Sequence, residues 1–197
     1  MTWLLPLIAF SAVSSGTPGP NNLLLWGSGA TFGFRRTVPH ILGTAVGIGA
    51  MACAVAAGLG TLITTVPGLA FAMKVGGSLY LLYLAWQVAG ASALRQAAVA
   101  KPLNLLQAAA FQAINPKAWI FALGAITTFR PAELPVLTGG LAVAVTMMVV
   151  ILPTAALWAV AGGAIDRTLR SDRARRVVSL VLALVLVASV VSEWLPA

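Results

Sequence analysis

Two short segments of this chain combine prolines with polar side chains inside long apolar runs. The first is Thr17-Pro18-Gly19-Pro20-Asn21, and the second is Asn115-Pro116-Lys117. A proline inside a helix lacks the amide donor and frees the carbonyl four residues earlier, so these prolines would free the carbonyls of Ser14, Gly16 and Gln112. Freed backbone groups next to amide, hydroxyl and ammonium groups can bind the polar ends of a small solute.

Each segment also has the composition of a helix start. Asn115 can cap a helix whose first residue is Pro116, and Thr17 and Pro18 can serve the first segment in the same way. Each start would direct the positive end of a helix dipole into the site, which suits a carboxylate, and Lys117 adds a full charge. Ordinary proline kinks that let helices bend and pack are the alternative interpretation. Two breaks at similar depth in two halves favour a binding site.

The elements that would position these segments are membrane spans. The chain is 60% hydrophobic and 8% charged with a mean hydropathy of +0.98, whereas soluble domains carry about 25% charged residues. The net charge of +8 would suit a nucleic acid, but the basic residues cluster between apolar runs and indicate topology instead. The lone Cys53 excludes an intrachain disulfide and gives no metal-binding spacing. The expected partners are therefore the lipid bilayer and a small solute, with no nucleic acid.

Six spans are predicted from the apolar runs, with Trp3 and Trp26 as interface anchors of the first. The spans cover Trp3–Trp26, Pro39–Thr64, Gly68–Ala91, Leu103–Thr128, Leu134–Gly163 and Val177–Trp194.

Three spans in each half make the two halves enter the membrane from opposite sides, so the repeat must be inverted. The prediction is an all-α membrane protein with one domain over 1–197, whose halves cover approximately 1–95 and 103–197. Helices one and four are broken. The loops after spans one, three and five hold nine Lys and Arg residues, whereas the other side holds only Arg130. The positive-inside rule then places both termini outside.

A second group of candidates lies on the third span. Lys74 is a charge within an apolar run, so it is a candidate for pore lining or coupling, or it extends its head to the interface. Gly76, Tyr80, Tyr83 and Gln87 follow spacings of four, three and four, so they share one helix face as candidate pore-lining residues. That face lies roughly opposite Lys74.

Small residues recur at a spacing that lets helices approach closely. Gly29 and Gly33 form one such pair, and Gly43 and Gly47 form another, so close packing is the expected role. His40 at the start of the second span is interpreted as an interface residue.

The motifs together resemble the LysE/RhtB family of amino-acid exporters over nearly the whole chain. The matching residues are Thr17-Pro18-Gly19-Pro20-Asn21, Gly43, Gly47, Lys74-Val75-Gly76, Tyr80-Leu81 and Asn115-Pro116-Lys117-Ala118. The resemblance implies a bacterial inner-membrane, multi-pass exporter of amino acids or close derivatives, driven by the proton gradient. It also implies that the substrate-site elements are Pro18, Gly19, Pro20, Asn21, Asn115, Pro116 and Lys117.

The acidic residues limit the substrate. Glu133, Asp166, Asp172 and Glu193 all fall at span ends or in a loop, so no intramembrane carboxylate can pair with a cationic side chain or carry a proton. We therefore expect neutral amino acids as substrates, and coupling would use Lys74 or Lys117.

The expected function is a secondary active exporter that works by alternating access. No His/Asp/Glu cluster, HExxH or GxSxG motif points to an enzyme, and no catalytic residue, metal ligand or cofactor is expected. An exporter or channel for another small solute, such as a metal ion, is the alternative, and a homo-oligomer is left open.

Overall fold

The computed structural model describes residues 2–89, 101–168 and 172–194, and these ranges form helices without any strand. The first range holds α1 (Leu4–Gly16), α2 (Pro20–Phe32), α3 (Phe34–Ala54), a π-helical turn (Val55–Leu59), α4 (Gly60–Thr65) and α5 (Leu69–Ala89). The other two ranges hold α7 (Leu105–Ile114), α8 (Pro116–Phe129), α9 (Val136–Thr168) and α10 (Asp172–Trp194). The prediction of an all-α protein is confirmed.

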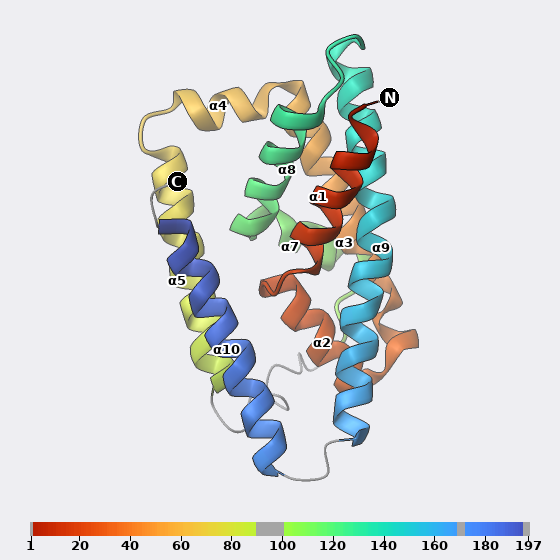
Figure 1. Ribbon diagram of the computed structural model, residues 1–197, viewed down its shortest axis with the longest axis vertical. Coiled ribbons are helices and arrows are strands. Elements are labelled where there is room, and N and C mark those ends of the chain that lie inside the picture. Colours follow the sequence, from red (N-terminus) through yellow and green to blue (C-terminus); the bar gives the residue numbers. More distant parts are fainter. Residues whose placement is uncertain (1, 90–100, 169–171, 195–197) are drawn as a thin grey trace.

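The helices form a bundle with a pair of helices along one edge. In Figure 1, α5 and α10 run side by side at that edge, and α4 lies across one end of the molecule. Within the bundle, α9 packs against α2 and α3, and α3 also packs against α7. In the described part, two helices are long and apolar enough to cross a membrane unaided, over Phe34–Leu59 and Val136–Ala164.

Glycines set the closest helix contacts in the bundle. A Cβ atom on Gly29 would overlap the backbone of Ala159, so α2 and α9 can approach only because this position lacks a side chain. Likewise a Cβ atom on Gly43 would overlap the backbone of Leu105, which brings α3 against α7. Gly33 was also expected to pack closely, but nothing lies within 4 Å of its Cβ position. Its role is conformational, as described below.

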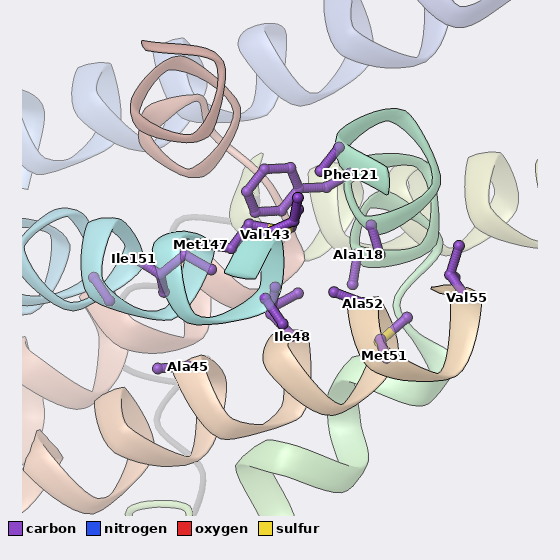
Figure 2. Close-up of a cluster of buried hydrophobic side chains, with 14 of the residues drawn as sticks. Ala45, Ile48, Met51, Ala52, Val55, Ala118, Phe121, Val143, Met147 and Ile151 are labelled. Carbon is purple, nitrogen blue, oxygen red and sulfur yellow. The ribbon is translucent and has the colours of Figure 1, made fainter. Parts of the chain in front are cut away.

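The main apolar core lies where α3, α8 and α9 meet. Figure 2 shows Ile48 from α3, Phe121 from α8, and Val143, Met147 and Ile151 from α9 pointing toward one another. Val143 and Met147 are completely buried. This core holds α8 against the two long helices, and it therefore fixes the position of the residue at which α8 begins.

The second span differs from its predicted bounds of Pro39–Thr64. Helix α3 begins at Phe34, because Gly33 adopts a φ of 79° that lets α3 follow α2 directly. Pro39 therefore lies inside the helix. At its other end the span bends at Gly58, whose φ is 113°, and α4 leaves in a new direction.

Trp26 was predicted to end the first span at the membrane interface, but it lies in the middle of α2. The chain is interrupted at residues 17–19, and α2 then continues to Phe32. Trp26 is consequently only 7% exposed, and its ring centroid lies 6.0 Å from that of Trp158 on α9. It is a packing residue between helices.

Candidate substrate site between two helix interruptions

The first interruption separates α1 from α2 at residues 17–19. Thr17 has φ −67° and ψ 145°, and Gly19 has φ −174° and ψ 175°, so the chain is extended here. Gly19 caps α2 and Pro20 is its first residue. The helix therefore restarts two residues later than the start predicted at Thr17 and Pro18. Proline suits the first helical position because an amide there has no carbonyl partner within the helix. The absence of the amide hydrogen in proline therefore costs no hydrogen bond.

The carbonyl oxygens of residues 14–17 all accept hydrogen bonds from side chains. The pairs are Thr17 Oγ1 to Ser14 O at 2.9 Å, Asn22 Nδ2 to Ser15 O and to Thr17 O at 2.7 Å each, and Trp158 Nε1 to Gly16 O at 3.2 Å. An unpaired carbonyl in lipid costs several kcal/mol, so these donors stabilise the interruption. In this conformation the freed carbonyls of Ser14 and Gly16 are occupied by the protein itself.

The second interruption is a single residue, Asn115, between α7 and α8. Its φ of −88° and ψ of 109° end α7, and Pro116 is the first residue of α8, as the sequence predicts. The Asn115 side chain does not cap α8. Instead its Nδ2 donates to Gln112 Oε1 at 3.2 Å, and its Oδ1 is buried with no hydrogen-bond partner among the described residues. One acceptor at this break is thus available to a ligand.

Lys117 joins the two interruptions across 100 positions of sequence. Its Nζ lies 2.6 Å from Thr17 O, 2.8 Å from Thr17 Oγ1 and 3.1 Å from Pro18 O. An ammonium group has three N–H donors, so these oxygens can use all of them. A Cβ atom on Gly19 would lie 2.8 Å from Lys117 Cδ, so glycine makes room for the lysine. Of the eight residues predicted at the two breaks, Gly19, Pro20, Asn21, Asn115 and Lys117 line one cavity, and Thr17 and Pro18 accept hydrogen bonds from Lys117. Pro116 instead packs against Gly77 of α5.

A buried polar network lies beside the breaks. Asn21 Oδ1 accepts from His40 Nε2 at 3.3 Å, from Thr44 Oγ1 at 3.0 Å and from Gln112 Nε2 at 3.0 Å. The exposed fractions of His40, Thr44 and Gln112 are 1%, 4% and 1%. Through the Gln112 side chain the network continues to Asn115, so Asn21 at the first break and Asn115 at the second are connected.

A small cavity lies between the interruptions, with a volume of about 40 Å³. Its polar lining includes Asn21, Gln112, Asn115 and Lys117, and its apolar lining includes Ile48, Phe121 and Ile151. A water molecule needs about 10–15 Å³ of such space. The cavity therefore has room for a few water molecules but not for an amino acid, so the structure represents a conformation closed around the site.

None of the α5 candidates whose side chains the structure describes lines this cavity. Lys74 lies over the ring of Trp194, 4.5 Å from its centroid, which joins α5 to α10. Gly76 and Tyr83 are exposed. Tyr80 contacts α7, the helix that precedes the second break, because its ring centroid lies 6.3 Å from that of Phe111.

Gln87 belongs to α5, but its side chain lies outside the described residues. Helix α5 contacts the second break at Gly77, where a Cβ atom would overlap the ring of Pro116. The ring of Pro116 therefore packs against α5 only because position 77 lacks a side chain.

Several polar residues of the site were not predicted from the sequence. Gln112 was noted only for its carbonyl, and His40 was placed at the membrane interface. Their position inside apolar runs could have revealed them, because polar side chains in such runs are costly unless they form hydrogen bonds with one another. His40 and Thr44 are four residues apart and Gln112 and Asn115 are three apart, so each pair shares a helix face.

The helices and the site define a class: a helical membrane protein with a small cavity between two helix interruptions, lined by both polar and apolar side chains. The family model for the LysE type translocator matches residues 12–191. The chain belongs to the LysE family, which confirms the resemblance noted from its motifs.

Curated relatives agree in length with this chain. The cysteine/O-acetylserine efflux proteins of Escherichia coli (strain K12) and Shigella sonnei (strain Ss046) are each 27% identical to it over 179 residues, which is 90% of both chains. The protein of that name from Escherichia coli O6:K15:H31 (strain 536 / UPEC) is 26% identical over the same share. No solved structure matches the chain. The protein is therefore a multi-pass inner-membrane transporter of the LysE type, and it is not an enzyme.

Proposed function

We propose that the chain is a secondary active exporter of small neutral amino acids or their close derivatives. Its single transport domain, 1–197, would consist of two inverted halves at about 1–95 and 103–197, each with three spans. The halves would move by alternating access around the cavity between the interruptions, which are the breaks of helices one and four. Both termini would face the periplasm, because nine of the basic residues lie in the loops on the opposite side.

The helix contacts support the inverted repeat. Both parts of the first interrupted helix, α1 and α2, pack against α9, which would be the second span of the second half. Both parts of the other interrupted helix, α7 and α8, pack against α3, which would be the second span of the first half. The remaining spans, α5 and α10, pack against each other. Exchanging the two halves reproduces this set of contacts, as a two-fold relation requires.

The charge distribution around the cavity supports binding of a carboxylate. Pro20 and Asn21 in the first turn of α2 line it, as do Lys117 and Ala118 in the first turn of α8, so the positive ends of two helix dipoles lie near the cavity. Lys117 adds an ammonium group at the same place. The observation that carries the proposal is the position of this ammonium group, which bridges the two breaks through the oxygens of Thr17 and Pro18.

The rest of the lining supports a neutral zwitterion. Asn115 Oδ1, buried and without a partner, can accept a hydrogen bond from a substrate ammonium group. Ile48, Phe121 and Ile151 provide an apolar wall for a short side chain. Among the described residues that line the cavity, none carries a carboxylate that could pair with a cationic side chain. Cysteine and O-acetylserine, which the relatives' names specify for those proteins, are neutral amino acids of this kind.

Opening of the cavity would then depend on Lys117. The present cavity is too small for an amino acid, so the two breaks must separate before a substrate enters. A substrate carboxylate can replace the Thr17 and Pro18 oxygens as the partner of the lysine. Such an exchange of partners would couple substrate binding to the movement of one half against the other.

The test is transport by purified protein in liposomes. Vesicles are loaded with labelled cysteine, O-acetylserine, lysine or glutamate, a pH gradient is imposed, and efflux is measured for wild type, Lys117→Ala and Lys101→Ala. Lys101 is an exposed lysine outside the cavity, so Lys101→Ala is the matched control. We expect saturable efflux of the neutral substrates from wild type and the control. Lys117→Ala should lose essentially all of it.

Other outcomes would contradict specific parts of the proposal. Normal efflux by folded Lys117→Ala would remove the lysine from the substrate site. Efflux that never saturates would indicate a channel. Efflux of lysine in preference to the neutral amino acids would overturn the proposed substrate class.

A further inference from the structure

We propose that His40 is the group that binds the coupled proton during transport. This inference rests on the proposed function, because it assigns a residue to the coupling of that transport. It differs from the sequence-based expectation, which gave the coupling role to Lys74 or Lys117. His40 lies on α3 beside the cavity, and it is linked to the cavity through Asn21.

The hydrogen bonds of His40 indicate its tautomer. Its Nε2 lies 3.3 Å from Asn21 Oδ1, an amide oxygen that can only accept, so Nε2 carries a hydrogen. A neutral imidazole then has an unprotonated Nδ1. This Nδ1 atom is buried and has no partner among the described residues. The structure therefore contains a basic nitrogen whose lone pair is directed at no donor.

Protonation of Nδ1 would be incompatible with this conformation. The bound proton would create a second N–H donor and a positive charge, and the described residues provide neither an acceptor for Nδ1 nor a counter-charge beside it. Any conformation that admits water or an acceptor to Nδ1 would bind the proton more tightly. By linkage, protonation would favour that open conformation over the closed one.

The network gives His40 a route to the substrate. Asn21 Oδ1 is shared between His40 and Gln112, and Gln112 in turn accepts from Asn115 Nδ2. Asn115 Oδ1 is the acceptor proposed for the substrate ammonium group. A substrate that reorients the Asn115 amide changes the partners of Gln112 and of Asn21, and hence the environment of His40.

Few other charged groups face His40 from the neighbouring elements. Helices α2 and α7, which pack against α3, contain no titratable residue, and α8 contains only Lys117. On α9 the titratable residues are Asp166 and Arg167 near its end, whose side chains lie outside the described residues. On α3 itself, Arg35 and Arg36 are exposed at the start of the helix.

Lys117 is less suited than His40 to release and rebind a proton from this conformation. Its ammonium group already has three oxygen partners, so loss of a proton would break a hydrogen bond to the first break. The lysine is better suited to hold a carboxylate. In this proposal Lys117 holds the substrate carboxylate, and His40 binds the coupled proton.

The sequence offers a direct test, because His40 is its one histidine. Wild-type protein carrying isotope-labelled histidine in detergent or nanodiscs would give one imidazole signal by NMR. The signal is titrated with pH in the presence and absence of cysteine. We expect the midpoint to change by about 0.7 pH unit or more, which corresponds to the roughly fivefold lower end of typical coupling. A midpoint that cysteine leaves unchanged would overturn the inference.

A second experiment uses His40→Gln, whose amide can still donate to Asn21 Oδ1 but cannot bind a proton at neutral pH. In proteoliposomes we expect this variant to exchange labelled for unlabelled cysteine at equal pH, but to lose accumulation driven by a pH gradient. Retained gradient-driven accumulation would exclude His40 as the coupling group. If the variant loses both activities, the NMR titration of the wild type decides.

The two proposals fail in different ways. If wild-type protein moves no amino acid in either assay, the proposed function is wrong, and the inference about His40 is wrong with it. If wild-type protein transports cysteine but its histidine titration is independent of cysteine, only the role of His40 is wrong.

Discussion

The two helix interruptions look equivalent in sequence but are built differently. At the first, residues 17–19 separate α1 from α2. The side chains of Thr17, Asn22 and Trp158 donate hydrogen bonds to the carbonyl oxygens of residues 14–16. At the second, Asn115 alone separates α7 from α8, and one of its side-chain atoms has no partner among the described residues. The first break is therefore stabilised by the protein, whereas the second retains an acceptor for a ligand.

The difference indicates a division of roles between the breaks. The first break supplies oxygens that hold Lys117 in the closed conformation, and the second supplies both Lys117 and the open acceptor on Asn115. Substitutions at the first break should then reduce stability most, and substitutions at the second should reduce substrate binding most.

The largest expected effect on stability is at Asn22, whose amide bonds two carbonyl oxygens at 2.7 Å. Asn22→Leu leaves Ser15 O without a donor. It also removes one donor from Thr17 O, which keeps its hydrogen bond from Lys117 Nζ. An unsatisfied buried group costs about 1–3 kcal/mol, so we expect a loss of about 2–4 kcal/mol. Reversible unfolding in detergent would measure it.

The control for this substitution is Asn104→Ala. Asn104 is an exposed residue that caps α7 far from either break, so its loss should cost only about 1 kcal/mol. Equal losses for the two variants would mean that the first break does not depend on Asn22.

The next effect is on substrate affinity, at Asn115. Asn115→Ala removes the free acceptor together with the donor to Gln112 Oε1. Hydrogen bonds to charged groups contribute about 1.5–3 kcal/mol, so KM for cysteine should rise about 10- to 100-fold. Stability should fall by about 1–3 kcal/mol, less than for Asn22→Leu, because the buried Gln112 Oε1 loses its donor. A variant that loses stability while KM stays constant would assign Asn115 to the fold alone.

Much of the fold could be predicted from local chemistry. The apolar runs indicated the helices, and the sequence Asn115-Pro116 indicated the start of α8, because a proline without an amide hydrogen fits the first helical position. The same rule misplaced the start of α2, because either Pro18 or Pro20 could satisfy it. The start at Pro20 leaves Gly16 O to accept from Trp158, 142 residues away, and no local pattern reveals that contact.

The position of His40 shows a second limit. Its burial follows from the early start of α3 at Phe34, which the positive φ of Gly33 makes possible. A helix starting at Pro39 would leave His40 in its first turn near the interface, as the sequence analysis assumed. One backbone angle thus decides whether this residue is counted as a surface group or as part of the site.

The smallest effects are expected from a matched pair of tryptophans, one at each break. Trp158 Nε1 donates to Gly16 O at 3.2 Å at the first break, and Trp119 Nε1 donates to Ala113 O at 2.9 Å at the second. Replacing either indole by phenylalanine removes one donor and keeps an aromatic ring, so each should cost about 1 kcal/mol of stability. Unfolding of Trp158→Phe and Trp119→Phe in detergent would measure both losses.

Transport by the same two variants tests the contrast between the breaks more closely. Neither indole donates to the oxygens that hold Lys117 or to the Asn115 side chain, so KM for cysteine should stay within about twofold of wild type in both. If Trp158→Phe alone raised KM as strongly as Asn115→Ala, the first break would bind substrate directly. The separation of a stabilising break from a binding break would then be wrong.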